Sequence, residues 1–203
     1  MPRVTGVRWA GRKADRGSRF SVLRLSKCSS DSAHSSGSDL WPVWPSARSA
    51  GPAKLLTVWR RAVLEVFPAA GIREPVRASA LAGAEERLGR SLPAELKQLL
   101  LESDGLLGRT HVDTVWTLDQ IVERNLLFWT DESFAQLYMS FDAFLFFGDN
   151  GGGDQFAFVQ KPERADVFVW EHESDSRRWV ARDLQDYLGR SLRTGGDDWY
   201  RQW

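Results

Sequence analysis

The sequence contains few of the residues from which metal centres and disulfide frameworks are built. Its single cysteine, Cys28, excludes an internal disulfide bond and any zinc site that uses several cysteines. The three histidines, His34, His111 and His172, are scattered along the chain, which argues against a histidine-based metal site. We therefore expect the protein to hold neither a metal ion nor an organic cofactor.

Long apolar segments are also missing. No run of residues approaches the ~18 apolar residues that a membrane-spanning helix needs. The basic N-terminal residues are not followed by the apolar stretch of a secretory signal, so we expect a cytoplasmic protein with no membrane partner. The 203 residues are 42% hydrophobic, which is enough for one globular domain with a core but cramped for two.

Recognisable catalytic motifs are absent as well. The sequence contains no G-x-S-x-G, no H-E-x-x-H and no nucleotide-binding fingerprint. Asp149 and Asp154 are the nearest approach to a pair of catalytic carboxylates, but no histidine, arginine or nucleophile stands beside them in a recognisable arrangement. We therefore predict that the protein is not an enzyme.

Charge distinguishes the N-terminal quarter of the chain from the rest. Residues 1–51 contain nine lysines and arginines and only three aspartates, a net charge of +6, so residues 52–203 carry −6. This segment lacks hydrophobic periodicity and includes the Ser-rich stretch SKCSSDSAHSSGSD, so we predict a disordered Arg/Ser-rich extension. Two other interpretations stay open: a translation start assigned too early, with the folded protein beginning near residue 50, and an arm that binds nucleic acid.

Hydrophobic spacing from residue 53 onward predicts helices, then strands, then a final helix. Ser79 is expected to cap the second helix, Thr117 and Gln120 to form a capping box at the fourth, and residues 130–133 to be a polar break. This order is typical of an α+β fold, in which an antiparallel β-sheet packs with several helices in a single domain. The Trp-rich tail, 193–203, is expected either to dock on the domain or to bind another molecule. Expected helices lie at 53–67, 79–89, 93–105, 117–126 and 183–192, and expected strands at 109–116, 143–147, 155–160, 167–171 and 179–180.

The segment FLFFGDNGGGDQFAFV, residues 144–159, places a stretch rich in Gly and Asp between two apolar runs. A phosphate-binding loop is excluded, because no Lys-Ser/Thr pair follows the glycines and because acidic side chains repel phosphate. Asp149, Asn150 and Asp154 supply oxygens for calcium, but the twelve-residue helix-loop-helix frame is missing and only one partial copy of a calcium-binding repeat is present.

A conformational role explains this stretch better. Glycines allow positive φ angles, and Asp and Asn side chains form hydrogen bonds to the backbone of a turn. We therefore predict a β-hairpin with a wide loop. Because consecutive glycines cost backbone entropy, either the loop needs several unusual φ angles or another molecule approaches its backbone closely.

Several of these features together resemble the SUKH superfamily, of the Smi/Knr type. The resemblance runs from about Ala53 to Leu192, and the Gly-rich hairpin is its most specific part. Asp104 stands where the family usually has asparagine, a mild change because aspartate also tolerates turns. The features are Leu92-Pro93 at a helix start, Asp104-Gly105 after that helix, the hairpin FFGDNGGGDQFAF, the segment VFVWEHES and the terminal helix.

The resemblance implies a SUKH-like domain over residues 53–192 that is not an enzyme. Many bacterial members of the superfamily are immunity proteins, which bind and neutralise a co-encoded toxin that is often a nuclease or a deaminase. Eukaryotic relatives are interaction scaffolds in cell-wall signalling. The net charge of −6 over residues 52–203 would steer such a domain toward a basic toxin, although many soluble domains are acidic for solubility alone.

Candidate contact residues lie on the hairpin loop and on the polar turn that follows the next strand. Trp170 is an aromatic candidate for a binding anchor, as is Trp179, and each also suits the core between sheet and helices. The alternative functions are a regulatory scaffold and a metal or small-molecule binder that uses residues 149–154; nucleic acid is not expected as a partner, and nothing indicates an oligomeric state. The proposed contact residues are Asp149, Asn150, Gly151, Gly152, Gly153, Asp154, Trp170, Glu171, His172, Glu173 and Asp175.

Overall fold

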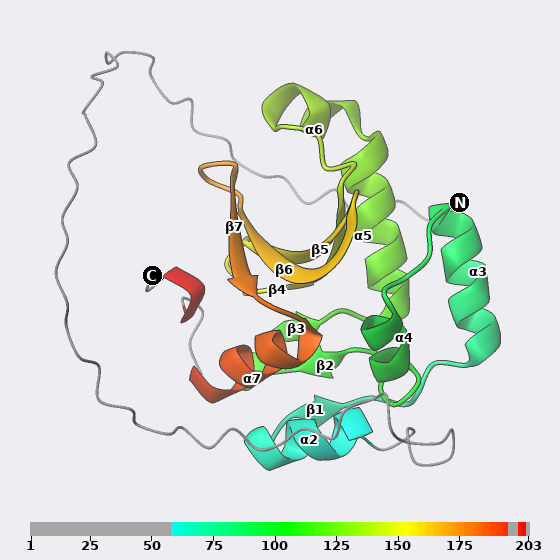
Figure 1. Ribbon diagram of the computed structural model, residues 1–203, viewed down its shortest axis with the longest axis vertical. Coiled ribbons are helices and arrows are strands. Elements are labelled where there is room, and N and C mark those ends of the chain that lie inside the picture. The colour runs from blue at the N-terminus through cyan, green and yellow to red at the C-terminus, as the bar shows by residue number, and fades with distance from the viewer. Residues whose placement is uncertain (1–57, 195–198, 202–203) are drawn as a thin grey trace, which may run out of the picture. The chain divides into compact units, whose positions relative to one another are not determined.

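The computed structural model describes residues 58–194 and 199–201, and the expected extension at 1–51 lies outside these residues. In the described part, six α-helices accompany two antiparallel sheets, one of three strands and one of four (Figure 1). This confirms the predicted α+β fold. None of the helices in these residues is both long and apolar enough to cross a membrane. The elements are α2 (Val58–Val66), β1 (Gly71–Ile72), α3 (Ala78–Leu88), α4 (Ala94–Leu100), β2 (Leu106–Leu107), η1 (Arg109–His111), β3 (Asp113–Val115), α5 (Leu118–Thr130), α6 (Glu132–Leu137), β4 (Phe144–Asp149), β5 (Gln155–Gln160), β6 (Glu163–Glu171), β7 (Ser176–Ala181), α7 (Leu184–Thr194) and η2 (Trp199–Arg201).

The four-stranded sheet is an antiparallel meander in the order β4-β5-β6-β7. Its first hairpin is the one predicted from the Gly-rich segment, with Asp149 opposite Gln155 at the loop. Gln155 in turn lies opposite Trp170, and the next residue, Glu171, lies opposite Ser176. This register places the β4–β5 loop and the β6–β7 turn at the same end of the sheet.

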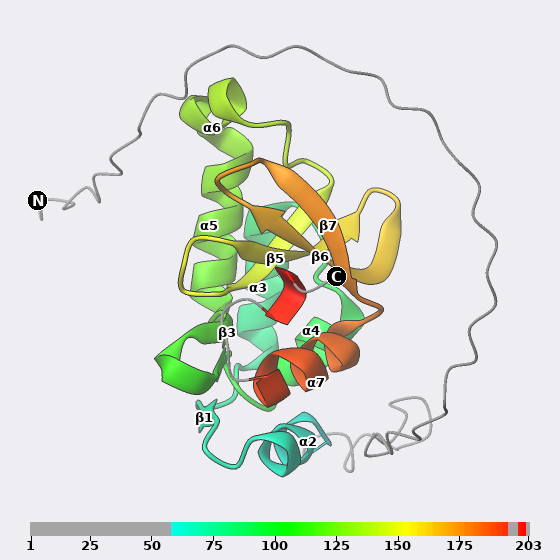
Figure 2. The same ribbon diagram turned by 90° about the vertical axis from the view of Figure 1, so that its left-hand side faces the viewer.

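Side chains alternate between the two faces of this sheet. Different helices cover the two faces (Figures 1 and 2). On one face, Phe146 and Trp170 pack against Phe128 of α5, with ring centroids 4.9 and 5.9 Å away. On the other face, Phe147 and Phe156 contact Tyr187 of α7 at 5.1 and 4.9 Å. The sheet is therefore the central layer between α5 and α6 on one side and α7 and η2 on the other.

The buried side chain of Asn125 joins α5 to β4. Its Nδ2 donates to the carbonyl of Phe146 at 2.7 Å, and its Oδ1 accepts from the Phe146 N–H at 2.8 Å. Asn125 is fully buried, so it takes the place that a neighbouring strand would take at this point of β4. The amide side chain thereby fixes the position of α5 on the sheet.

Two of the helix boundary signals are confirmed and one is wrong. Thr117 and Gln120 form the predicted capping box at the start of α5, and Gly89 ends α3 with a positive φ of 63°. The prediction that Ser79 caps α3 is wrong, because α3 begins at Ala78 after Arg77, which has no side-chain cap. Ser79 lies inside the helix instead.

Other differences concern short elements. The expected strand at 109–116 is a 3-10 turn followed by the three-residue β3. The expected polar break at 130–133 contains the start of α6, where the Asp131 carboxylate accepts from the Ser133 N–H. In the tail, Trp199 and Tyr200 of η2 are buried against the domain, which agrees for these residues with one of the two expectations.

We predict that Asn125→Ala lowers the free energy of unfolding by about 3 kcal/mol. The substitution leaves the N–H and carbonyl of Phe146 unpaired in the core, and each unsatisfied buried group costs about 1–3 kcal/mol. Urea denaturation at pH 7 measures the effect. Glu123→Ala on the exposed side of the same helix is the matched control and should change stability by no more than ~0.5 kcal/mol. A loss under about 1 kcal/mol for Asn125→Ala would contradict this role.

Candidate protein-binding surface

The β4–β5 loop, residues 150–154, is organised by the side chain of its own asparagine. The Oδ1 atom of Asn150 accepts hydrogen bonds from the N–H groups of Gly152 and Asp154, at 2.8 and 3.0 Å. Gly151 and Gly153 have φ angles of 74° and 113°, a region that residues with a side chain rarely adopt. The structure thus confirms the conformational interpretation of the Gly-rich stretch.

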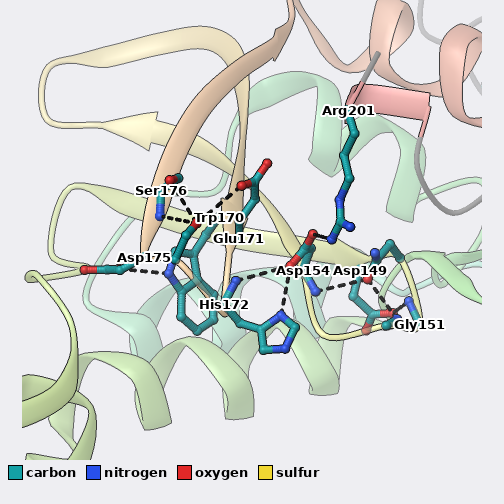
Figure 3. Close-up of polar contacts among 12 residues, drawn as sticks. Asp149, Gly151, Asp154, Trp170, Glu171, His172, Asp175, Ser176 and Arg201 are labelled. Atoms are coloured by element: carbon teal, nitrogen blue, oxygen red, sulfur yellow. Dashed lines mark hydrogen bonds and ion pairs between the residues drawn. The ribbon is translucent and has the colours of Figure 1, made fainter. Parts of the chain in front are cut away.

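Asp154, at the end of this loop, is a buried residue at the centre of a polar cluster (Figure 3). Its side chain is only 1% exposed. Oδ2 accepts hydrogen bonds from the Tyr200 hydroxyl at 2.6 Å and from Arg201 at 2.7 Å. Oδ1 accepts from the His172 N–H at 3.2 Å and lies 2.9 Å from the ring Nδ1. One carboxylate therefore contacts the β6–β7 turn and the C-terminal η2 at once.

The environment of Asp154 favours its charged form. Burial works to raise the pKa of the carboxyl group, but hydrogen bonds from Tyr200, Arg201 and His172 together outweigh burial and hold the pKa below its ordinary value. Burial, with the nearby carboxylate of Asp154, raises the pKa of the Tyr200 hydroxyl. Tyr200 therefore remains a neutral hydrogen-bond donor, and it also accepts a hydrogen bond from Nδ2 of Asn150 at 2.7 Å.

Asp149, at the other end of the loop, is also fully engaged. Its Oδ2 accepts from the indole N–H of Trp116 at 2.7 Å and from Arg124 at 3.1 Å, while Oδ1 accepts from the Gly151 N–H at 2.9 Å. Trp116 precedes α5 and Arg124 lies on it, so this carboxylate links the loop to that helix.

These contacts change the electrostatic character expected of the loop. The Asp149 and Asp154 side chains are 15% and 1% exposed, whereas their partners Arg124 and Arg201 are 39% and 46% exposed. The guanidinium groups therefore reach solvent further than the carboxylates do. What the loop offers to another molecule is mainly the exposed backbone of Gly151 and Gly152, rather than its acidic groups.

The ion pairs of Asp149 and Asp154 also make catalysis or metal binding by these two carboxylates unfavourable. Either carboxylate would have to give up a hydrogen-bonded ion pair before it could act as a general base or a metal ligand. Among residues 58–194 and 199–201, no group of three or more His, Cys, Asp or Glu side chains is arranged to hold a metal ion.

The β6–β7 turn lies beside this loop, but its residues point in different directions (Figure 3). His172 faces the loop, and Glu171 pairs with Arg178 of β7. Glu173 is exposed. Asp175, with a positive φ of 56°, faces away from the loop and accepts from the Trp170 indole N–H at 2.9 Å.

Trp170 itself belongs to the core rather than to the surface. It is 5% exposed and packs edge-to-face on Phe141 and Tyr138, with centroids 4.9 and 5.0 Å away. Of the two tryptophans considered as anchors, Trp179 on β7 is the exposed one, at 46%.

Two exposed apolar residues beside the turn were missed from the sequence. Leu137 at the end of α6 is 72% exposed, and Met139 is 62% exposed. The Met139 N–H donates to Asp175 at 2.8 Å, and its carbonyl accepts from Arg177 at 2.6 Å. The apolar run Leu137-Tyr138-Met139 was the available signal, but a polar break was expected just before it.

Comparison with known families identifies the domain that carries both loops. The sequence model of the SMI1 / KNR4 family (SUKH-1) matches residues 75–190, which is more than half of the chain. The chain belongs to the SUKH-1 family. This confirms the resemblance to the SUKH superfamily predicted from the hairpin and the helix boundaries. No curated protein matches the chain.

Members of the SUKH-1 family are generally non-catalytic, and they include immunity proteins that bind other proteins. The matched segment begins after α2 and ends before η2. Even so, Trp59 and Val63 of α2 and Tyr200 of η2 are buried in the same core as the matched elements. We therefore propose that the SUKH-1 domain of this chain includes both of these flanking elements, which extends the predicted range of 53–192 at its C-terminal side.

We predict that Tyr200→Phe lowers the free energy of unfolding by about 2 kcal/mol at pH 7, because a hydrogen bond to a charged group contributes about 1.5–3 kcal/mol. The lowered folded-state pKa of Asp154 means that its contribution is present above the unfolded pKa of about 3.9 and is lost as the pH falls through the folded-state value. The difference in the free energy of unfolding between Tyr200→Phe and the parent protein should therefore become smaller below about pH 4.

Urea denaturation between pH 3 and pH 7 checks this prediction. Tyr138→Phe is the matched control, because the Tyr138 hydroxyl has no hydrogen bond within the described residues. A Tyr200→Phe effect that stayed constant across this pH range would show that the hydroxyl does not act through the Asp154 carboxylate.

Proposed function

We propose that this SUKH-1 protein is a non-catalytic immunity protein that binds and neutralises a bacterial toxin, such as a nuclease or a deaminase. The bacterial cytoplasm is the compartment in which we propose that it acts. The observation that carries the proposal is the preorganised end of the sheet, where the β4–β5 loop and the β6–β7 turn are fixed side by side by Asp154 and His172. A surface whose loops are ordered before binding loses less conformational entropy in a complex.

The residues of this end divide into supporting and contacting groups. Asn150, Asp154 and Trp170 are buried, so we propose that they give the surface its shape. Gly151, Gly152 and Glu173 are exposed, and we propose that they contact the partner directly. The other proposed contact residues are partly buried, and we propose that only their solvent-exposed atoms contact the partner. These residues are Asp149, Gly153, Glu171, His172 and Asp175.

The net negative charge of residues 52–203 supports a basic partner. The hairpin loop itself adds little to this argument. Residues 52–203 carry a net charge of −6, although Asp149 and Asp154 are paired with arginines. A protein with this net charge attracts a basic toxin over long range and accelerates association with it. The proposed metal or small-molecule site at 149–154 gains no support, since both of its carboxylates already hold arginine partners.

Co-expression with a toxin tests the proposal. The toxin-like C-terminal domain encoded by the reading frame next to this one should arrest growth alone and be tolerated when this protein is co-expressed. The two proteins should also elute together from a gel-filtration column at micromolar concentration. A toxin domain of the same class from an unrelated locus is the control and should remain lethal. Growth arrest that persists with the neighbouring toxin, together with separate elution, would refute the proposal.

A further inference from the structure

The two most exposed large apolar side chains of the described residues lie close together in sequence, at the end of α6 and just after it. Leu137 is 72% and Met139 is 62% exposed, compared with 46% for Leu127 and Trp179. The helix α6 has no buried residue of its own. Leaving two large apolar side chains in water is unfavourable, and adjacent exposed apolar side chains are a feature of interaction surfaces.

The segment that carries these side chains is firmly attached to the domain. Phe134 of α6 contacts Phe128 of α5 edge-to-face at 5.0 Å, and Tyr138 contacts Trp170 in the same way, also at 5.0 Å. The Asp131 side chain caps the start of α6. Leu137 and Met139 are therefore held outward by a segment whose aromatic residues are packed inward.

This segment is joined to the β6–β7 turn through the backbone of Met139. The Asp175 carboxylate accepts a hydrogen bond from the Met139 N–H at 2.8 Å, and Arg177 donates one to the Met139 carbonyl at 2.6 Å. Asp175 also accepts from the Trp170 indole, so the turn, the core and the α6 segment share one carboxylate. The backbone of Met139 is thus held against the turn that carries Glu173.

The two segments joined by these hydrogen bonds each carry an exposed acidic side chain, Glu132 on α6 and Glu173 on the β6–β7 turn. Neither glutamate has an ion pair within the described part of the chain. The nearby cation, Arg177, is only 11% exposed at its side chain and is paired with Asp175 at 3.0 Å. A partner that covers Leu137 and Met139 would therefore meet unpaired carboxylates at the edge, which favours lysine and arginine on its side.

We propose that Leu137 and Met139 form the apolar centre of the surface that binds the toxin, that Glu132 and Glu173 form its acidic edge, and that the partner is a basic protein. This assignment rests on the proposed immunity function and makes it more specific. It moves the centre of the interface from the hairpin loop to the α6 segment and the β6–β7 turn. Apolar side chains at the centre of an interface account for most of its affinity, whereas charges at the edge mainly set the association rate.

The double variant Leu137→Ser/Met139→Ser tests the apolar centre. Its affinity for the neighbouring toxin domain, measured by calorimetry with an inactive form of that domain, should fall on the order of 100-fold. Trp179→Thr on β7 is the matched control, because Trp179 is a large apolar side chain exposed on another element of the domain. The affinity of this variant should stay within about 3-fold of the parent value. Circular dichroism should show that both variants remain folded.

The acidic edge is tested by kinetics. Glu132→Gln/Glu173→Gln should reduce the association rate by about 10-fold at low salt, and the difference should shrink as salt is added. Glu74→Gln/Glu86→Gln is the control, since both glutamates are exposed and have no ion pair within the described residues. This control pair should leave the association rate within about 2-fold of the parent value.

The outcomes separate this assignment from the proposed function. If the parent binds the toxin and Leu137→Ser/Met139→Ser binds equally well, or if Trp179→Thr alone abolishes binding, the surface is wrong and the immunity function stands. If no neighbouring toxin binds the parent, the proposed function fails and this assignment fails with it. If the parent forms a dimer that the double variant abolishes while toxin affinity is unchanged, the surface binds a second copy, which also overturns the assignment.

Discussion

The functional end of this domain depends on one buried carboxylate that three separate chain segments share. Asp154 belongs to the β4–β5 loop, His172 to the β6–β7 turn, and Tyr200 with Arg201 to the C-terminal η2. A charged group this deeply buried is tolerated only when hydrogen bonds and an ion pair satisfy it. The need to satisfy Asp154 therefore fixes the relative positions of the loop, the turn and the tail.

This arrangement explains why a Gly-rich, acidic loop need not be a ligand-binding loop. The glycines supply the positive φ angles, Asn150 bonds the loop backbone, and the two aspartates at its ends bind residues outside the loop. Each polar side chain of the loop thus has a structural partner, and its exposed atoms belong mainly to glycine backbone. The two most exposed large apolar residues, Leu137 and Met139, lie instead at the end of α6 and just after it.

Features set by neighbouring residues could be predicted from the sequence, and features set by distant partners could not. The β4–β5 hairpin follows from the two apolar runs that flank the Gly-rich stretch, and the capping box follows from Thr117 and Gln120, three positions apart. Tyr200, by contrast, lies 46 residues beyond its acceptor Asp154, and no local pattern indicates that contact. The two-residue strands β1 and β2 were also missed, because strands that short have no periodicity to detect.

The docked tail has a practical consequence for how fragments of this protein are prepared. A fragment trimmed to the family-matched segment would end at residue 190. It would lack Tyr200 and Arg201, which donate hydrogen bonds to the Asp154 carboxylate. Its Phe156 side chain would also lose the ring of Trp199, which stacks on it at a centroid distance of 5.8 Å. Expression vectors for crystallisation or display should therefore retain the chain through Arg201, and affinity tags belong at the opposite terminus.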